Sequence, residues 1–339
     1  MKKFLRRSSL LFMLLFMLNS FGVYVSAAPI SPAESLADSI MIQFGTYERI
    51  GSTPLYNAAG EREATCYTYL PTGYVIINEN DLSVPEFSPE NDSPFVSGAG
   101  VEKFIYGGPV SYYAQTTSET TIDLTTRAIV TDIPLYSREP LSAAEQYARV
   151  SNNTNATRAS LSYMTRHRPC TFASSYYCGL DGSAIVLRYL HDYHDTDLLP
   201  SNALNSPQLQ AYLINGRYIP DTGTTGANLV KGVRYNSVRY TGLNQFLTDR
   251  GSSIRASNLA FTNSRWEMFL NSFTNDYPVL LGTVKNFPMD QYSNHWLIAY
   301  GYFYQDLSGG HIIVNDGFGS NGIYVTADIQ YYGQIILFS

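Results

Sequence analysis

Residues 177–190 read Tyr-Cys-Gly-Leu-Asp-Gly-Ser-Ala-Ile-Val-Leu-Arg-Tyr-Leu. Behind the cysteine, apolar residues recur near the 3.6-residue period of an α-helix, which predicts a helix with one apolar face. Cys178 would stand at the start of that helix. The free N–H groups and the positive dipole end at a helix start favour a thiolate. The stretch therefore makes Cys178 a candidate nucleophile.

The composition is that of a globular protein with few charges. The chain has 339 residues, of which 45% are hydrophobic and 15% are charged, and it contains 28 tyrosines. This length predicts about two domains, or one large domain with an appendage. The net charge is −6, and no basic block occurs outside the N-terminus. We therefore expect neither nucleic acid nor an anionic membrane surface as a partner.

The first 27 residues have the pattern of a signal peptide. Basic residues lie at positions 2, 3, 6 and 7, an apolar run covers 10–18, and Ala27 is a small residue suited to cleavage. The apolar run is shorter than the roughly 20 residues that a membrane-spanning helix needs. The pattern predicts a secreted, extracellular protein without stable membrane insertion, made by a bacterium if the resemblance described below holds.

The chain has three cysteines, Cys66, Cys170 and Cys178. An odd number in a secreted chain leaves at least one cysteine unpaired or in an intermolecular bridge. Cys66 and Cys170 could form a disulfide or could be two buried thiols, and buried thiols are the simpler interpretation. Cys170 is a second candidate nucleophile, but Cys178 has the better helix start.

The first half of the chain is rich in β-type patterns. Ser31-Pro32-Ala33-Glu34 predicts a capped helix that runs to about Met41. Residues 64–70 and 73–78 predict strands. Residues 79–97 are rich in Pro, Ser, Asn and acidic groups and predict a loop. Residues 137–162 are polar in large part and predict an exposed linker of the kind that proteases cut.

In the second half, helical patterns come before strand patterns. Residues 266–273 predict an amphipathic helix, and apolar strand-like runs follow at 278–282, 295–302, 312–319, 324–326 and 334–338. Helices that precede strands in this way favour an α+β fold, with the helices packed against one side of an antiparallel sheet.

His295 stands at the start of one of these strands, and Asn315-Asp316 ends another. A cysteine nucleophile needs a base, and that base needs an orienting partner. A side-chain carbonyl at 315 or 316 could accept the imidazole N–H of His295. Because successive strand residues face opposite sides of a sheet, only one of the two would serve.

The histidines His191 and His194 are three residues apart, but no third ligand follows at a telling spacing. Cations near the end of a helix are also favoured by the helix dipole. We therefore predict no metal site and no cofactor.

Four stretches occur in the order found in papain-like (clan CA) cysteine peptidases. They are the helix that begins at Cys178, Pro-Val-Leu-Leu-Gly at 278–282, His-Trp-Leu-Ile-Ala-Tyr-Gly-Tyr at 295–302 and Ile-Ile-Val-Asn-Asp-Gly-Phe-Gly at 312–319. From about residue 170 to 339 the chain resembles this family, and within it the bacterial streptopain-like and bacteriocin-leader-peptidase-like branches. The resemblance implies a helical subdomain that carries the Cys helix, packed on an antiparallel sheet that carries His and Asn.

The resemblance also implies residue roles. Cys178 would be the nucleophile and His295 the general base, which later acts as the acid. Asn315 would orient His295, since a glycine and an aromatic residue follow as in the streptopain-like pattern. Asp316 would be the orienter if the other branch is the nearer relative.

The first half is similar to the propeptide of streptopain-like enzymes. The similar segments are Pro-Leu-Tyr-Asn-Ala-Ala-Gly-Glu at 54–61 and Gly-Tyr-Val-Ile-Ile-Asn at 73–78. This implies a zymogen with a mostly β propeptide-like domain at 28–136, the linker 137–162 and a peptidase domain at 163–339. The propeptide would be an intramolecular inhibitor, and proteins or peptides would be the substrates.

Two departures from the family pattern keep other hypotheses open. First, no glutamine lies between Gln146 and Cys178, and Phe172 occupies the place where many relatives have the glutamine that helps to bind the oxyanion. Second, Leu180-Asp181 follows Cys178-Gly179. Loss of one oxyanion donor costs a serine enzyme about 100- to 1,000-fold in rate. The alternative is a weakened or inactive papain-fold module that binds peptides or regulates. A third hypothesis is the same Cys-His chemistry on another acyl substrate.

Overall fold

The computed structural model describes residues 30–98, 100–117, 120–125, 127–130, 133, 140–142, 144–146, 148, 160–163, 178–219, 240–259, 266–283, 295–305, 309–327 and 332–339. The predicted signal peptide, most of the predicted linker and Cys170 lie outside these residues. Residues Pro32 to Ser339 form one compact unit. Within the described residues, no helix combines the length and the hydropathy needed to cross a bilayer.

The first half contains the predicted helix followed by strands. Helix α2 spans Pro32–Met41, with proline in its first turn, and buries Leu36, Ala37 and Ile40 on one face. The strands are β1 (Glu48–Tyr56), β2 (Arg62–Leu70), β3 (Tyr74–Asn78), β4 (Glu86–Ser88), β5 (Val101–Tyr106), β6 (Tyr112–Thr116), β7 (Thr121–Asp123) and β8 (Ile129–Val130).

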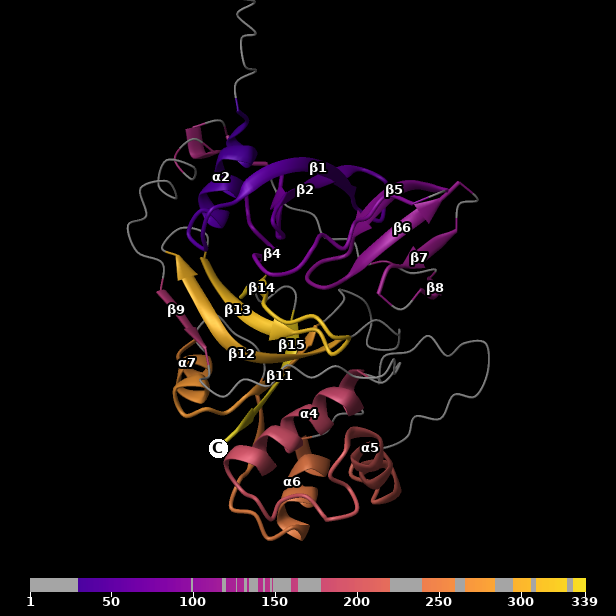
Figure 1. Ribbon diagram of the computed structural model, residues 1–339, viewed down its shortest axis with the longest axis vertical. Coiled ribbons are helices and arrows are strands. Elements are labelled where there is room, and N and C mark those ends of the chain that lie inside the picture. The colour runs from indigo at the N-terminus through magenta and orange to yellow at the C-terminus, as the bar shows by residue number, and fades with distance from the viewer. Residues whose placement is uncertain are drawn as a thin grey trace, which may run out of the picture. The chain divides into compact units, whose positions relative to one another are not determined.

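In the second half, most helices come before a run of apolar strands (Figure 1). Its elements are β9 (Ser160–Tyr163), α4 (Cys178–Tyr193), α5 (Ser206–Asn215), α6 (Tyr240–Asp249), β10 (Ala256–Leu259), α7 (Trp266–Thr274), β11 (Val279–Thr283), β12 (Trp296–Gln305), β13 (Gly309–Asn315), β14 (Ile323–Thr326) and β15 (Tyr332–Phe338). Residues 160–162, which we assigned to the end of the linker, belong to β9 and pair with β12.

One continuous sheet runs through both halves. Its order is β10-β15-β11-β12-β13-β14-β4-β3-β2-β1-β5-β6-β7-β8, with β9 paired beside β12. Among the pairings that the described residues show, β1–β5 is parallel and the others are antiparallel. The chain is thus a mixed helix-and-sheet protein with a large sheet, and the papain-like arrangement stays a prediction.

The short strand β4 joins the two halves. In the predicted loop 79–97, residues Glu86–Ser88 instead pair with β14, with Phe87 opposite Tyr324. Phe87 is fully buried and its ring stacks on that of Tyr324 at 4.5 Å between centroids. The loop prediction is therefore wrong at 86–88, because burial of Phe87 and pairing with β14 override the turn-forming composition.

Cys66 lies on β2 as a buried free thiol, and burial raises its pKa to about 12. A thiol with such a pKa is almost entirely protonated at neutral pH and is a poor nucleophile. Of the two interpretations of Cys66, the buried thiol agrees with the structure.

The carboxyl group of Glu86, on β4, lies in the interior where the two halves join, and 0% of the residue's surface is exposed. The carboxyl accepts hydrogen bonds from the hydroxyl groups of Tyr74 and Tyr112 and from the backbone N–H of Val110. Burial raises the pKa of Glu86 from 4.5 to about 7, and the hydrogen bonds from Tyr112 and Tyr74 oppose this rise.

The folded chain should therefore hold the Glu86 proton more tightly than the unfolded chain does. Stability linked to this group is then fully present below pH 4.5 and is lost as the pH rises through about 7. We expect the free energy of unfolding to fall by up to about 3 kcal/mol over this window. In urea unfolding, Glu86→Gln should reduce the pH dependence of the free energy of unfolding. Glu48→Gln, at an exposed position, should leave that pH dependence unchanged. Identical profiles for the parent and Glu86→Gln would contradict the assignment.

Candidate functional site: the starts of α4 and β12

Helix α4 begins at Cys178, as the sequence predicts. Its interior residues are almost all buried, and Ala184, Leu187 and Leu190 are each 1% exposed or less. Within the first turns of α4, the Ser183 hydroxyl donates a hydrogen bond to the Gly179 carbonyl oxygen at 2.7 Å. The side chain of Cys178 itself lies outside the described residues. The backbone of Cys178 lies at the start of a buried helix.

Helix α4 packs closely on β11 and β12. A Cβ atom added to Gly182 would meet the Leu280 side chain at 3.0 Å and that of Ile298 at 3.8 Å, so the helix lies close to the sheet at this glycine. At the other end of α4, the His194 ring contacts the Asp276 carbonyl oxygen at 2.9 Å through Nε2. Asp276 lies just before β11. Helix α4 therefore runs opposite to β11 and in the same direction as β12.

This direction brings Cys178 towards His295. Cys178 lies four residues before Gly182, about 6 Å along the helix axis. His295 lies three residues before Ile298, about 10 Å along the strand. Because a Cβ atom on Gly182 would lie 3.8 Å from Ile298 and the two elements run in the same direction, both predicted residues lie towards the same end of the layer. The starts of α4 and β12 thus lie at the same end of this layer (Figure 1).

The backbone of His295 is fixed by Thr283 at the end of β11. The N–H of Thr283 donates to the His295 carbonyl at 2.8 Å, and the His295 N–H donates to the Thr283 hydroxyl at 2.9 Å. The next residue, Trp296, is fully buried. His295 itself is half-buried, so a rigid strand end presents its ring at the edge of the core.

The ring of His295 contacts the backbone carbonyl oxygen of Asp316 through Nε2 at 2.6 Å. A carbonyl oxygen only accepts hydrogen bonds, so Nε2 carries the proton in this contact. In the neutral ring the lone pair then lies on Nδ1. Phe318 stacks on the ring, with centroids 4.9 Å apart and planes 12° apart. These contacts fix both the tautomer and the tilt of the ring.

Asn315 and Asp316 use their side chains to build the turn after β13. The Asn315 amide accepts from the Gly317 N–H at 2.7 Å and donates to the Asn321 side chain at 2.6 Å. The Asp316 carboxyl accepts from the backbone N–H groups of Phe318 and Ser320. The described contact to His295 therefore comes from the Asp316 main chain. The orienting side chain that we expected at Asn315, or alternatively at Asp316, stays a prediction.

Three groups that contact His295 were not predicted from the sequence: the Asp316 carbonyl, the Thr283 hydroxyl and the Phe318 ring. A main-chain carbonyl carries no residue-type signal, and Thr283 meets His295 only through the β11–β12 pairing. Phe318 had a signal, because an aromatic residue after Asn-Asp-Gly belongs to the pattern that suggested Asn315.

The other described histidines have structural contacts. His191 Nδ1 accepts from the Leu199 N–H at 3.3 Å, and the His194 ring stacks on Tyr277. Buried His311 contacts the Val84 carbonyl at 2.8 Å. No group of three His, Cys, Asp or Glu side chains within the described ranges has the arrangement of a metal site.

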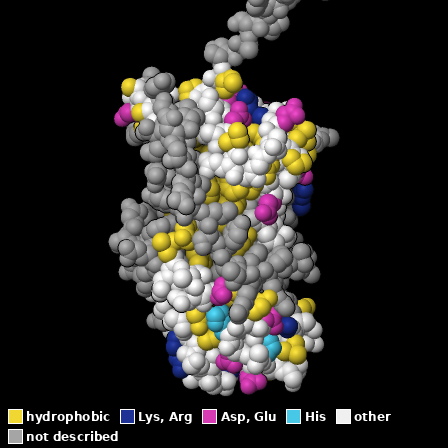
Figure 2. Space-filling model, turned by 60° about the vertical axis from the view of Figure 1, so that its left-hand side comes forward, with side chains coloured by type: hydrophobic (Ala, Val, Ile, Leu, Met, Phe, Trp, Pro, Cys, Tyr) yellow, Lys and Arg dark blue, Asp and Glu magenta, His cyan; other side chains and the backbone are white. Residues whose placement is uncertain are grey.

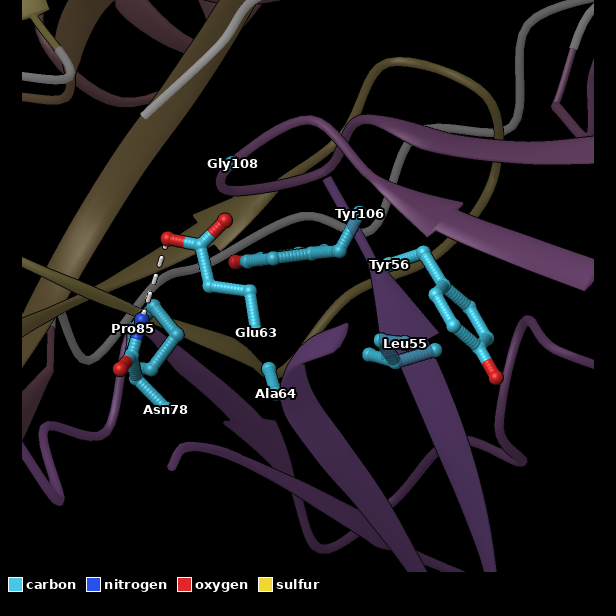
Figure 3. Close-up of a pocket in the computed structure, with 8 residues that line it drawn as sticks. All are labelled: Leu55, Tyr56, Glu63, Ala64, Asn78, Pro85, Tyr106 and Gly108. Carbon is cyan, nitrogen blue, oxygen red and sulfur yellow. Dashed lines mark hydrogen bonds between the residues drawn. The ribbon is translucent and has the colours of Figure 1, made fainter. Parts of the chain in front are cut away.

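Charged residues make up 15% of the chain. In the view of Figure 2, acidic and basic side chains are scattered rather than gathered in one patch. A hollow in the first half lies between β1, β2 and β5 and is lined by Leu55, Tyr56, Glu63, Ala64, Asn78, Pro85, Tyr106 and Gly108 (Figure 3). Its Glu63 carboxyl accepts from the Asn78 amide at 3.3 Å. None of these lining residues belongs to α4, β11 or β12, so the hollow is distinct from the Cys178–His295 end.

Comparisons with known proteins give likenesses to solved structures. No protein-family model matches the chain, and no curated protein matches it. One solved structure to which the chain is similar is the active wild-type interpain A cysteine protease of Prevotella intermedia. The two are 16% identical, the match covers 48% of this chain and 82% of that chain, and the TM-score is 0.32. These values do not assign the chain to a family.

Proposed function

We propose that this chain is a secreted cysteine endopeptidase made as a zymogen, with Cys178 as nucleophile and His295 as general base and acid. The observation that supports the proposal is that α4 and β12 begin at the same end of the layer, where the Asp316 carbonyl contacts Nε2 of His295. A helix-start cysteine and a fixed imidazole are the two parts that nucleophilic thiol chemistry needs.

In the proposed reaction, Nδ1 of His295 takes the proton of the Cys178 thiol. The sulfur then attacks the carbonyl carbon of a peptide bond and forms a tetrahedral intermediate. His295 returns the proton to the leaving amine, and a thioester remains on Cys178. Water, deprotonated by the same imidazole, attacks the thioester and releases the acid and the thiol. The Cys178 N–H at the helix start is a candidate donor to the oxyanion.

Contacts between the first half and the turn that carries Asp316 support the zymogen part of the proposal. The Ser88 hydroxyl donates to the Gly322 carbonyl at 2.8 Å, and the Asn91 amide contacts the Asn321 carbonyl. Asn321 also accepts from Asn315. The first half therefore contacts the turn whose backbone holds His295, and its removal would release that turn.

The test follows the chain from Ala28 onward by intact mass, beside Cys178→Ala. The parent should lose its first half by cleavage within 137–162, and Cys178→Ala should remain full length. Equal processing of both would contradict the proposal. If both stay intact, an added protease can cut the linker before an assay on an unfolded protein. Absence of Cys178-dependent hydrolysis at that point rules out the peptidase.

A further inference from the structure

Asp181 is a buried carboxyl group in the first turn of α4, with 1% of its surface exposed. The Nε2 amide of Gln210, on α5, donates a hydrogen bond to its Oδ1. The two residues are 29 positions apart, so the contact is made only because α5 packs on α4. The interior of the helix pair thus contains a carboxyl group that the proposed reaction does not use.

The position of Asp181 on the helix places it next to the proposed nucleophile. Residues three or four apart on a helix are neighbours, with about 5–6 Å between their Cβ atoms. Cys178 lies three residues before Asp181 and four before Gly182. Asp181 lies on the side of α4 that packs on α5, and Gly182 lies on the side that packs on β11 and β12. Cys178 lies one turn before both.

Two acidic groups this close compete for one negative charge. Both would gain from the positive end of the helix dipole, but each disfavours ionisation of the other. A carboxyl is a stronger acid than a thiol, and an ionised Asp181 disfavours the thiolate of Cys178. Two charges about 6 Å apart, at an effective dielectric constant of about 20, shift a titration by about one to two pH units.

Three described elements packed on α4, namely α5, β11 and β12, contain no charged residue within their bounds. Helix α5 and strand β11 contain no Asp, Glu, Lys, Arg or His within Ser206–Asn215 and Val279–Thr283. Their titratable group is Tyr212, and β12 adds Tyr300, Tyr302 and Tyr304 along the strand. His295 precedes β12 at the end nearest Cys178.

We propose that Asp181, held by Gln210, is a positioning residue that raises the proton affinity of the Cys178 thiol and so keeps the proposed nucleophile in its neutral form near neutral pH. This inference rests on the proposed function for its meaning in catalysis, but the electrostatic pairing is a property of the folded chain. Gln210, which is half-buried on α5, contacts this carboxylate.

The test titrates Cys178 directly. The chain from Ala28 onward is labelled with ¹³Cβ-cysteine, and the Cys178 signal is assigned by its absence from Cys178→Ser. Its chemical shift reports thiol ionisation whether or not reagents can reach the sulfur. The variants are Asp181→Asn, which keeps the shape, and Gln210→Met, which removes the donor. The matched controls are Asp192→Asn, further along α4, and Gln208→Met, exposed on α5.

We expect Asp181→Asn to lower the midpoint of the Cys178 titration by about one to two pH units. Gln210→Met should lower it as well, since a buried carboxylate without its donor takes up a proton. The two controls should leave it unchanged. An unchanged or higher midpoint in Asp181→Asn, or a Cys178 signal that does not titrate in that variant, would overturn the inference.

Hydrolysis is measured separately, on the same samples, so that the two proposals can fail independently. If the midpoint shifts as expected but no variant cleaves peptides, the proposed function fails and the Asp181 pairing stands. If the parent cleaves peptides and the midpoint does not move, the pairing fails alone. Where both hold, the acid limb of the pH–rate profile should move to lower pH in Asp181→Asn.

Discussion

Replacing His295 with alanine is expected to lower kcat/KM for peptide hydrolysis by about a thousand-fold or more. The imidazole is the group proposed to take the thiol proton and to return it to the leaving amine, so both steps lose their proton carrier. The fold should persist, because the strand end is held by backbone contacts between residue 295 and Thr283 that alanine keeps. The measurement is steady-state hydrolysis of a fluorogenic peptide by chain whose linker has been cut.

His191→Ala is the matched control for this prediction. His191 lies on α4 and accepts one hydrogen bond from the Leu199 N–H, so its loss should cost about 1 kcal/mol of stability with little change in rate. Similar rates for His295→Ala and the parent would remove His295 from the mechanism. An equal loss of kcat/KM in both variants would show that removing either histidine has the same general effect, which would contradict a specific role of His295.

Replacing Phe87 with alanine is expected to destabilise the chain by about 3–5 kcal/mol. Phe87 is fully buried where β4 meets β14, and its ring contacts those of Phe44, Phe303, His311 and Tyr324. Its removal leaves a cavity that the surrounding strands fill only in part. Because β4 joins the halves, hydrogen exchange of β14 amides should also rise, first at Thr326, whose N–H donates to the Pro85 carbonyl.

Phe104→Ala separates the loss of core volume from the loss of the junction. Phe104 is buried on β5 and contacts Phe95, within the first half of the chain. This variant should lose stability of similar size but keep the protection of β14 amides from exchange at temperatures where the chain is folded. Equal exchange at Thr326 in the two variants would contradict the role of Phe87 at the junction.

Much of the second half could be predicted because its signals are local. Helix α4 and strands β11 to β13 follow from apolar periodicity, and the structure places them within a few residues of the expected bounds. The placement of Cys178 and His295 at element starts was also visible. These predictions hold because buried, apolar elements have composition and packing that favour the same structure.

What the sequence did not reveal depends on contacts between distant residues. Strand β4 has three residues between Pro85 and Pro89, and it becomes a strand through β14. The contact to His295 comes from a main-chain oxygen, and the partner of Asp181 lies on another helix. A one-dimensional pattern contains neither the neighbours of a short strand nor the direction of a carbonyl group.

The central claim is that Cys178 is a nucleophile served by His295. The most direct measurement is the position of the adduct formed by a peptidyl epoxide on chain with a cut linker, read by tandem mass spectrometry in the parent and in His295→Ala. The account predicts one adduct, on Cys178, that forms much more slowly without His295. An adduct on Cys170, or labelling of Cys178 at the same rate in both chains, would contradict it.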